Sequence, residues 1–242
     1  MFHLHTIRAL KDNYIWLLEN SCKQVIIVDP GTAEPVINYL NQNELLPLAI
    51  LLTHHHIDHV GGVSELKNKY PNATIYGPSE IKLPITNLTN QHEVSIGDFY
   101  FKVIPLPGHT LGHLAYYCHP YLFCGDTLFS AGCGRIFEGT YQQMLCSLKK
   151  LKQFPDDTFI CAGHELTLAN LNFAKSMVPD DKEINHYFNS MSNRSVTLPS
   201  TLNNEKRINL FLRCEEKSLQ DKFNFNNELE LFVFFRSLKD NF

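Results

Sequence analysis

The sequence lacks the cysteine patterns that hold small secreted domains and cysteine-zinc knuckles together. Its seven cysteines are an odd number, and no two of them form a C-x-x-C pair. Disulfide frameworks use paired cysteines and persist in oxidising compartments. We therefore expect free thiols in a reducing compartment and predict a cytoplasmic location.

An excess of basic residues and long apolar runs are absent as well. The net charge of −4 provides no overall basic surface to neutralise nucleic-acid phosphates. No apolar run reaches the ~18 residues of a membrane helix. Arg8, Lys11 and Asp12 interrupt the first stretch, so it contains no signal-peptide core. We expect a monomer whose partner is neither nucleic acid nor a membrane.

The remaining pattern is that of a layered α/β protein. Buried strands are predicted at Val25–Val28, Leu48–Leu52 and Thr74–Tyr76, with helices at Pro35–Asn41 and Val63–Lys69 between them. Further strands and a hairpin are predicted at Ile15–Leu18, Phe99–Ile104, Leu114–Cys118, Tyr121–Phe123 and Thr158–Ala162. Because helical patterns dominate from there on, we predict one domain over residues 1–165 and a second over 166–242.

A cluster of metal-binding residue types follows one of these strands. Thr53–Gly62 reads T-H-H-H-I-D-H-V-G-G and contains four histidines and one aspartate. His54 and His56 are two residues apart, so they point to the same side of an extended chain. Asp58 and His59 follow, and the two glycines after them are expected to allow a tight turn into a helix. Imidazole and carboxylate together suit zinc and related ions. The alternative is a histidine-rich surface turn, which would need no partners elsewhere.

Such partners are present. His109, Asp126 and His164 each follow a predicted strand, which makes seven candidate ligands from four strand ends. Seven ligands exceed the need of one tetrahedral ion and suit two ions that share a carboxylate and a water. Asp29 also ends a strand, and we predict that it orients a ligand histidine by a hydrogen bond.

The motifs T-H-x-H-x-D-H, G-H-T-x-G-H, G-D-T and G-H-E resemble those of the metallo-β-lactamase superfamily. Within it, Gly132-Cys133-Gly134-Arg135 and the C-terminal Arg236, Lys239, Asp240 and Phe242 resemble glyoxalase II, the hydroxyacylglutathione hydrolase family. The resemblance implies an αββα sandwich over residues 1–165 and a small helical substrate-binding domain over 166–242.

The resemblance also implies a ligand assignment. His54, His56 and His109 would hold one divalent ion, while Asp58, His59 and His164 would hold a second. Asp126 would bridge the two ions. His55 and His113 are not ligands in this pattern. Zinc is the expected metal, with iron and manganese as alternatives.

The implied reaction is hydrolysis of S-2-hydroxyacylglutathione, chiefly S-D-lactoylglutathione, to glutathione and D-lactate. This is the second step of methylglyoxal detoxification. A metal-bridging hydroxide would attack the thioester, and Asp58 and Asp126 would position it as catalytic residues.

Five residues are predicted to bind the glutathione thioester. Arg236 and Lys239 share a face of a predicted helix over Asn227–Leu238 and would bind one carboxylate, while Arg135 in the glycine-rich stretch would bind near the glycyl end. The alternative is that they are solvated surface cations. Phe137 and Leu166 occupy positions where the family often has tyrosine, so phenolic hydrogen bonds to the substrate would be lost.

Three rival functions predict other sequence features. A persulfide dioxygenase of the same superfamily would use one iron, and a nuclease would carry a basic insertion. A non-catalytic binding module would be expected to have lost ligands. All seven ligands are present, which favours the hydrolase.

Overall fold

The fold consists of two units, each of which draws on two stretches of the chain. The structure, a computed structural model, describes residues 2–242. The first unit comprises the chain up to Pro105 together with Gly112–Gly125, and the second comprises Leu106–Leu111 together with Asp126–Phe242. The predicted domain boundary between residues 165 and 166 stays a prediction.

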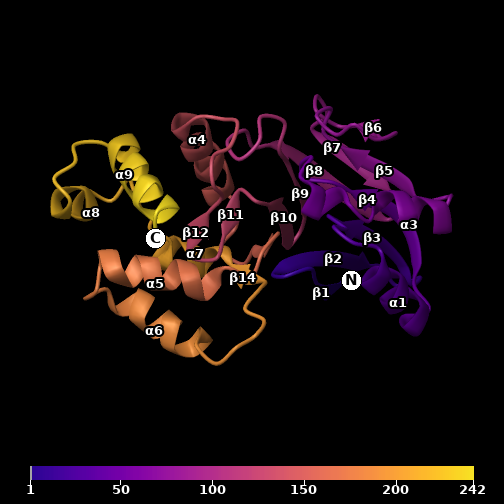
Figure 1. The fold of residues 1–242 in the computed structure, drawn as a ribbon, viewed down its shortest axis with the longest axis horizontal. Helices are drawn as coiled ribbons and strands as arrows, with labels where there is room; N and C mark the ends of the chain where they lie inside the picture. Colours follow the sequence, from indigo (N-terminus) through magenta and orange to yellow (C-terminus); the bar gives the residue numbers. More distant parts are fainter. Residues whose placement is uncertain (1) are drawn as a thin grey trace. The chain divides into compact units, whose positions relative to one another are not determined.

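The first unit contains a six-stranded sheet with the strand order β1-β2-β3-β4-β5-β6 (Figure 1). Its strands are β1 (His3–Ala9), β2 (Asn13–Glu19), β3 (Gln24–Val28), β4 (Leu46–Leu51), β5 (Thr74–Gly77) and β6 (Thr86–Asn87). The pairs from β1 to β3 are antiparallel, and those from β3 to β6 are parallel. The parallel strands therefore end at the same edge of the sheet.

Both faces of the central strands are buried. In β3, Val25 to Val28 are all buried, as expected for a parallel strand covered on both sides. Val25 and Ile27 belong to the hydrophobic core that includes residues of α1 (Glu34–Asn43) and α3 (Val63–Lys69). A short helix, α2 (Ile57–Val60), follows β4.

Four antiparallel strands of the first unit lie in the order β10-β9-β8-β7. They are β7 (Glu93–Ile96), β8 (Phe99–Pro105), β9 (Leu114–Cys118) and β10 (Tyr121–Gly125). The hydroxyl of Tyr116 in β9 donates to the carbonyl of Leu52 at 2.6 Å, and the amide of Leu114 donates to the carbonyl of Thr53 at 2.8 Å. These bonds anchor the chain directly after β4, where the histidine cluster begins.

The second unit is mostly helical. Its elements are β11 (Leu128–Phe129), β12 (Gly132–Cys133), α4 (Tyr141–Lys152), β13 (Phe159–Ala162), α5 (Thr167–Met177), α6 (Lys182–Met191), β14 (Ser200–Thr201), α7 (Leu202–Ile208), α8 (Lys217–Lys222) and α9 (Glu228–Asp240). Its aromatic core includes Phe211, whose ring contacts the rings of Phe173, Phe232 and Phe235. No helix within residues 2–242 is long and apolar enough to cross a membrane.

The predicted fold class is confirmed: α/β layers come first, and helices dominate the C-terminal part of the chain. The predicted strands and helices all have counterparts within a few residues. The prediction missed β1 and β7, which are only partly buried and mix apolar with polar residues, and it missed the short elements α2, β6, β11, β12 and β14.

Helix α4 supports the loop that carries His109. The hydroxyl of Ser147 donates to the carbonyl of Pro107 at 2.8 Å, and the amide of Gly139 donates to the carbonyl of Gly108 at 3.1 Å. The helix begins at a capping box in which Thr140 accepts from the amide of Gln143 and the Gln143 side chain accepts from the amide of Thr140.

We predict that Thr140→Ala lowers the free energy of unfolding by about 1 kcal/mol, because it leaves a helical amide without its cap. Thermal unfolding followed by circular dichroism measures the loss. Gln142→Ala is the control, since Gln142 is exposed on the same first turn and caps nothing. Equal melting temperatures for the two variants would contradict the capping role.

Candidate metal centre

The carboxylate of Asp29 organises the polar end of the parallel strands. Asp29 directly follows β3, and Thr53 follows the neighbouring β4, so the two residues meet at the same sheet edge. One Asp29 oxygen accepts from the Thr53 amide at 2.8 Å, and the other accepts from the Thr53 hydroxyl at 2.7 Å. Both residues are buried, so these bonds are made in an environment of low dielectric.

These hydrogen bonds orient two ligand histidines. Thr53 Oγ1 donates to Asp29, so it accepts from His54 Nδ1, 2.9 Å away. His59 Nδ1 lies 3.0 Å from Asp29 Oδ2 and donates to it. Since each ring uses Nδ1 as a donor, Nε2 is the unprotonated nitrogen that can bind a metal. The predicted hydrogen bond between Asp29 and a histidine of the motif is present, at His59, whose role as a ligand stays a prediction.

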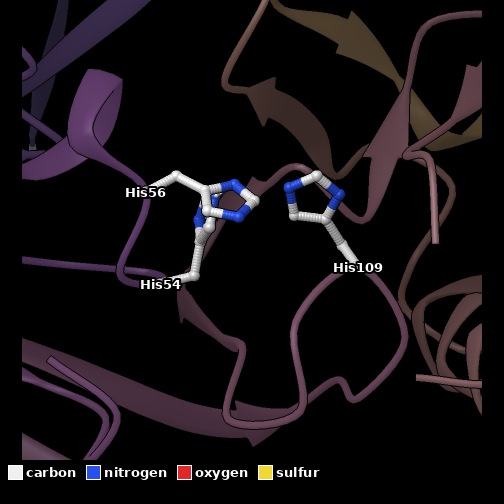
Figure 2. A group of neighbouring side chains, drawn as sticks. All are labelled: His54, His56 and His109. Atoms are coloured by element: carbon white, nitrogen blue, oxygen red, sulfur yellow. Dashed lines mark hydrogen bonds between the residues drawn. The ribbon is translucent and has the colours of Figure 1, made fainter. Parts of the chain in front are cut away.

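His54 and His56 turn their rings toward one another after β4 (Figure 2). His54 Nε2 and His56 Nδ1 are 3.1 Å apart. Metal–nitrogen bonds of ~2.1 Å at tetrahedral angles place two ligand atoms roughly 3.4 Å apart. The separation therefore suits two ligands of one ion, one binding through Nε2 and the other through Nδ1.

Asp58 lies in the first turn of α2 and is held by a residue that the sequence did not single out. Asn13, at the start of β2, donates from Nδ2 to Asp58 Oδ2 at 3.0 Å. The same Asp58 oxygen lies 3.6 Å from His59 Nε2. Asn13 pairs with a residue 45 positions away, and no local pattern marks such a contact.

The predicted turn into a helix is present at the two glycines after His59, because Gly61 ends α2 and Gly62 precedes α3. Gly61 and Gly62 have ordinary right-handed helical angles, with φ of −60° and −84°. Their function is close approach, because a Cβ on Gly61 would lie 2.6 Å from the carbonyl oxygen of Gly31, and one on Gly62 would lie 2.5 Å from the carbonyl carbon of Thr32. The glycines let the segment after β3 lie against α2.

In the second unit, one carboxylate oxygen faces two ligand histidines. Asp126 Oδ2 lies 3.4 Å from His109 Nε2 and 3.3 Å from His164 Nε2. His109 Nδ1 donates to the carbonyl of Arg135 at 2.7 Å, so Nε2 is the ring nitrogen able to bind a metal. The distances from Asp126 Oδ2 to the two Nε2 atoms match those between ligand atoms that share an ion.

The two other histidines of the motifs have structural contacts. His113 is buried, and its ring stacks on that of His54 with a centroid separation of 4.9 Å. The ring of His55 meets that of His56 edge-on. Packing of this kind restricts the rotation of the ligand rings.

The predicted substrate-binding residues all lie in the second unit. Arg236 is buried, with Nη1 donating to the carbonyl of Cys133 at 2.7 Å and Nη2 paired with Asp240 at 3.0 Å. Arg135 is half-exposed and pairs with the same carboxylate at 3.2 Å. Burial, followed by the charges of Arg236 and Arg135, lowers the pKa of Lys239, which Asp240 opposes. The side chain of Phe137 is exposed and meets the His109 ring edge-on, and Leu166 precedes α5.

The structure thus groups His54, His56, Asp58 and His59 in the first unit and His109, Asp126 and His164 in the second. The donor atoms fit a divalent metal by their chemistry and by their spacing within each unit. The division of the seven ligands between two ions stays a prediction.

We predict that Asp29→Asn weakens zinc binding by about 10- to 100-fold, because an amide cannot accept all three hydrogen bonds now made to the carboxylate. Competition with a chromophoric chelator measures the dissociation constant. Asp98→Asn is the matched control, since Asp98 is exposed and accepts a hydrogen bond from Asn20, outside the cluster of predicted ligands. An unchanged zinc affinity in Asp29→Asn would show that the ligand rings need no support from this residue.

Comparison with known proteins places these residues in a family. The profile of the metallo-beta-lactamase superfamily matches residues 10–164, and that of the hydroxyacylglutathione hydrolase C-terminus matches residues 165–242. A hydroxyacylglutathione hydrolase from Pectobacterium atrosepticum is 53% identical over 252 residues, covering 99% of this chain and 100% of that protein.

Solved structures agree. The B3 metallo-beta-lactamase BLEG-1 is 28% identical with a TM-score of 0.67, covering 88% of this chain and 99% of that one. TTHA1623, solved in a di-iron-bound form, is 25% identical with a TM-score of 0.64, covering 86% of this chain and 100% of that one. Superfamily membership and the His/Asp clusters together imply that the chain binds divalent metal. From its sequence over the whole length, its fold and its ligand residues, the chain belongs to the hydroxyacylglutathione hydrolase family of the metallo-beta-lactamase superfamily.

Proposed function

We propose that the chain is a metal-dependent thioesterase that hydrolyses S-2-hydroxyacylglutathione, with S-D-lactoylglutathione as its main substrate, to glutathione and D-lactate. It would thus perform the second step of methylglyoxal removal. The observation that carries the proposal is the identity of 53%, over the whole length, to a hydroxyacylglutathione hydrolase, in a chain that retains all seven predicted ligands.

Two ions divided among the seven ligands are part of the proposal. His54, His56 and His109 would hold the first ion, and Asp58, His59 and His164 the second, with Asp126 shared. The separations of 3.1 Å between His54 and His56 and of 3.3–3.4 Å around Asp126 support shared coordination. The di-iron form of TTHA1623 supports a count of two. Mixed nitrogen and oxygen donors accept zinc, iron or manganese, and zinc is the metal we propose.

When bound, two divalent ions lower the pKa of a shared water toward neutrality and polarise a carbonyl oxygen. The protein's contribution is orientation. Asp58 and Asp126 accept hydrogen bonds from the attacking water and direct its lone pair, while Asn13 holds the Asp58 carboxylate in place. Asp29 and the carbonyl of Arg135 hold His59 and His109 in the tautomer that presents Nε2.

The leaving group explains why no acid is needed. A thiolate is a stable anion near neutral pH compared with an alkoxide, because thiols have a pKa of about 8.5. The mechanism therefore needs neither a side-chain nucleophile nor a strong general acid. A thioester suits this set of residues better than an amide does.

A group of cations in the second unit favours an anionic substrate. Arg135 and Arg236 both pair with Asp240, and Lys239 is close enough to all three for its pKa to respond to them. Three positive charges share one carboxylate, which leaves a net positive site. Glutathione carries two carboxylates. Lys239 also lies over the rings of Phe173 and Phe242, which restrict its ammonium group.

Two of the residues predicted to bind the substrate depart from the family pattern. Phe137 is 61% exposed beside His109 and has no hydroxyl to offer. The side chain of Leu166 likewise has no hydrogen-bonding group. We propose that these positions contact the substrate through apolar surface alone. The cytoplasmic location and the monomeric state remain predictions.

The purified protein should release glutathione from S-D-lactoylglutathione, and a chelator should abolish the release until zinc is restored. Asp126→Asn should lower kcat by at least 100-fold and the bound metal from two ions toward one, because an amide is a poor bridging ligand. Thiol release and elemental analysis of the same sample measure both. Two bound metals without thioesterase activity would contradict the substrate, and one iron without hydrolysis would favour the dioxygenase.

Lys239→Ala should raise KM for the glutathione thioester about tenfold, the effect of losing one charge-assisted hydrogen bond, with kcat nearly unchanged. Arg236→Ala should raise KM as well, and it should also lower the melting temperature because its guanidinium is buried against Cys133. Lys222→Ala, an exposed cation of α8, is the control. A Lys239→Ala enzyme with an unchanged KM would show that this lysine does not bind substrate.

A further inference from the structure

The hairpin β11–β12, together with the residues that flank it, is linked to all three predicted ligand residues of the second unit. Asp126 stands two residues before β11, and the carbonyl of Arg135, two residues after β12, accepts from His109 Nδ1 at 2.7 Å. The ring of Phe129 in β11 meets the ring of His164 edge-on, with centroids 6.0 Å apart. A shift of the hairpin would therefore move Asp126, His109 and His164 together.

The two ends of the hairpin are locked against one another. The amide of Gly134 donates to the carbonyl of Thr127 at 3.2 Å. A Cβ on Gly134 would lie 1.8 Å from the carbonyl oxygen of Asp126 and 3.3 Å from His109 Nδ1. The backbone of Gly134 thus packs directly beside two predicted ligand residues, so a shift of the hairpin would disturb both.

The turn of the hairpin has an unfavourable backbone conformation. Ala131 has a φ of +56°, in the left-handed region where a Cβ is strained and glycine is favoured. Ala131 is also buried, as is Ser130 before it. A turn of this kind keeps its shape only when its surroundings determine it.

Three buried polar side chains from the C-terminal part of the chain hold this turn by hydrogen bonds. Glu205, in α7, accepts from the Ser130 hydroxyl at 2.8 Å and from the Ala131 amide at 2.7 Å. Asn209 donates to the carbonyls of Phe129 and Gly132 at 3.1 and 2.9 Å. Asn170, in α5, donates to the carbonyl of Ser130 at 3.0 Å.

Glu205 is the centre of this anchor. It is fully buried, and burial raises the pKa of its carboxyl, which the hydrogen bonds from its neighbours oppose. Asn209 Nδ2 also donates to it, at 3.3 Å. Burying a carboxyl group costs free energy unless hydrogen bonds satisfy it, and two of the groups that satisfy this one, the Ser130 hydroxyl and the Ala131 amide, belong to the strained turn.

We infer that Glu205 is a positioning residue for the metal ligands: through the Ser130–Ala131 turn it fixes the β11–β12 hairpin, and the hairpin in turn holds Asp126, His109 and His164. The helical C-terminal part of the chain thereby shapes metal binding as well as any substrate contact. The inference rests on the proposed function only for the assignment of these three residues as ligands.

The test measures metal binding by the full-length protein without substrate. Zinc dissociation constants are obtained by chelator competition, and the visible absorption of the Co²⁺-loaded protein reports the ligand geometry. Glu205→Ala removes both acceptors from the turn and should weaken binding at least tenfold and alter the Co²⁺ spectrum. Glu205→Gln keeps an oxygen for the Ala131 amide and an amide group that Ser130 can accept from, so its affinity should stay within about threefold of wild type.

Two further variants separate positioning from general stability. Asp181→Ala removes another carboxylate that accepts backbone amides, at the start of α6, and should lower the melting temperature without changing zinc affinity. Ala131→Gly, added to Glu205→Ala, relieves the left-handed strain and should restore several-fold of the lost affinity. If Glu205→Ala does not fold, Asn170→Ala takes its place, with an expected weakening of about threefold.

The outcomes are distinct. Zinc affinity and a Co²⁺ spectrum equal to wild type in a folded Glu205→Ala, or in Asn170→Ala, would overturn the inference. Equal weakening in Asp181→Ala would also overturn it, because the effect would then be one of stability. A wild-type protein that binds metal but does not hydrolyse the thioester would contradict the proposed function and leave this inference standing.

Discussion

The hydrogen bonds to the buried carboxylate of Asp29 are the interactions on which the predicted ligands of the first unit depend. This carboxylate lies at the common end of two parallel strands and accepts from Thr53 and from His59, so it fixes the chain direction after β4 and the tautomer of two rings. The polar group can be buried there because three hydrogen bonds satisfy it. Glycines 31, 61 and 62 then allow the backbone of the neighbouring loop to lie against α2.

In the second unit, hydrogen bonds also orient the predicted ligand side chains, but other groups make these bonds. Asp126 presents one oxygen to His109 and His164, and a backbone carbonyl rather than a carboxylate holds the His109 ring. The geometry of these groups depends on a strained turn that the C-terminal helices hold by buried polar contacts. Both units therefore use second-layer hydrogen bonds to orient imidazoles, because an imidazole that rotates freely pays an entropic penalty on binding.

The C-terminal part of the chain thus bears on both the proposed substrate binding and the position of the β11–β12 hairpin. Its cations, grouped around Asp240, suit an anionic substrate, and Arg236 at the same time ties α9 to the carbonyl of Cys133 in β12. The proposed substrate contact and the position of the hairpin therefore involve the same side chain, that of Arg236. A substitution at Arg236 is consequently a poor probe of either role by itself, whereas Lys239 and Glu205 separate them.

Whether a feature could be predicted from the sequence depends on how far apart along the chain its contacting residues lie. Thr53–Gly62, His109, Asp126 and His164 could be recognised because each follows an apolar run, and the α/β class could be recognised from the alternation of elements. By itself the sequence determined the donor types, the family and the main strands and helices. Only the tertiary structure decided that Asn13 holds Asp58, that the glycines serve close approach, and that Glu205 anchors the hairpin. Those contacts join residues 30 to 75 positions apart, and local patterns carry no information about which distant chain segment packs where.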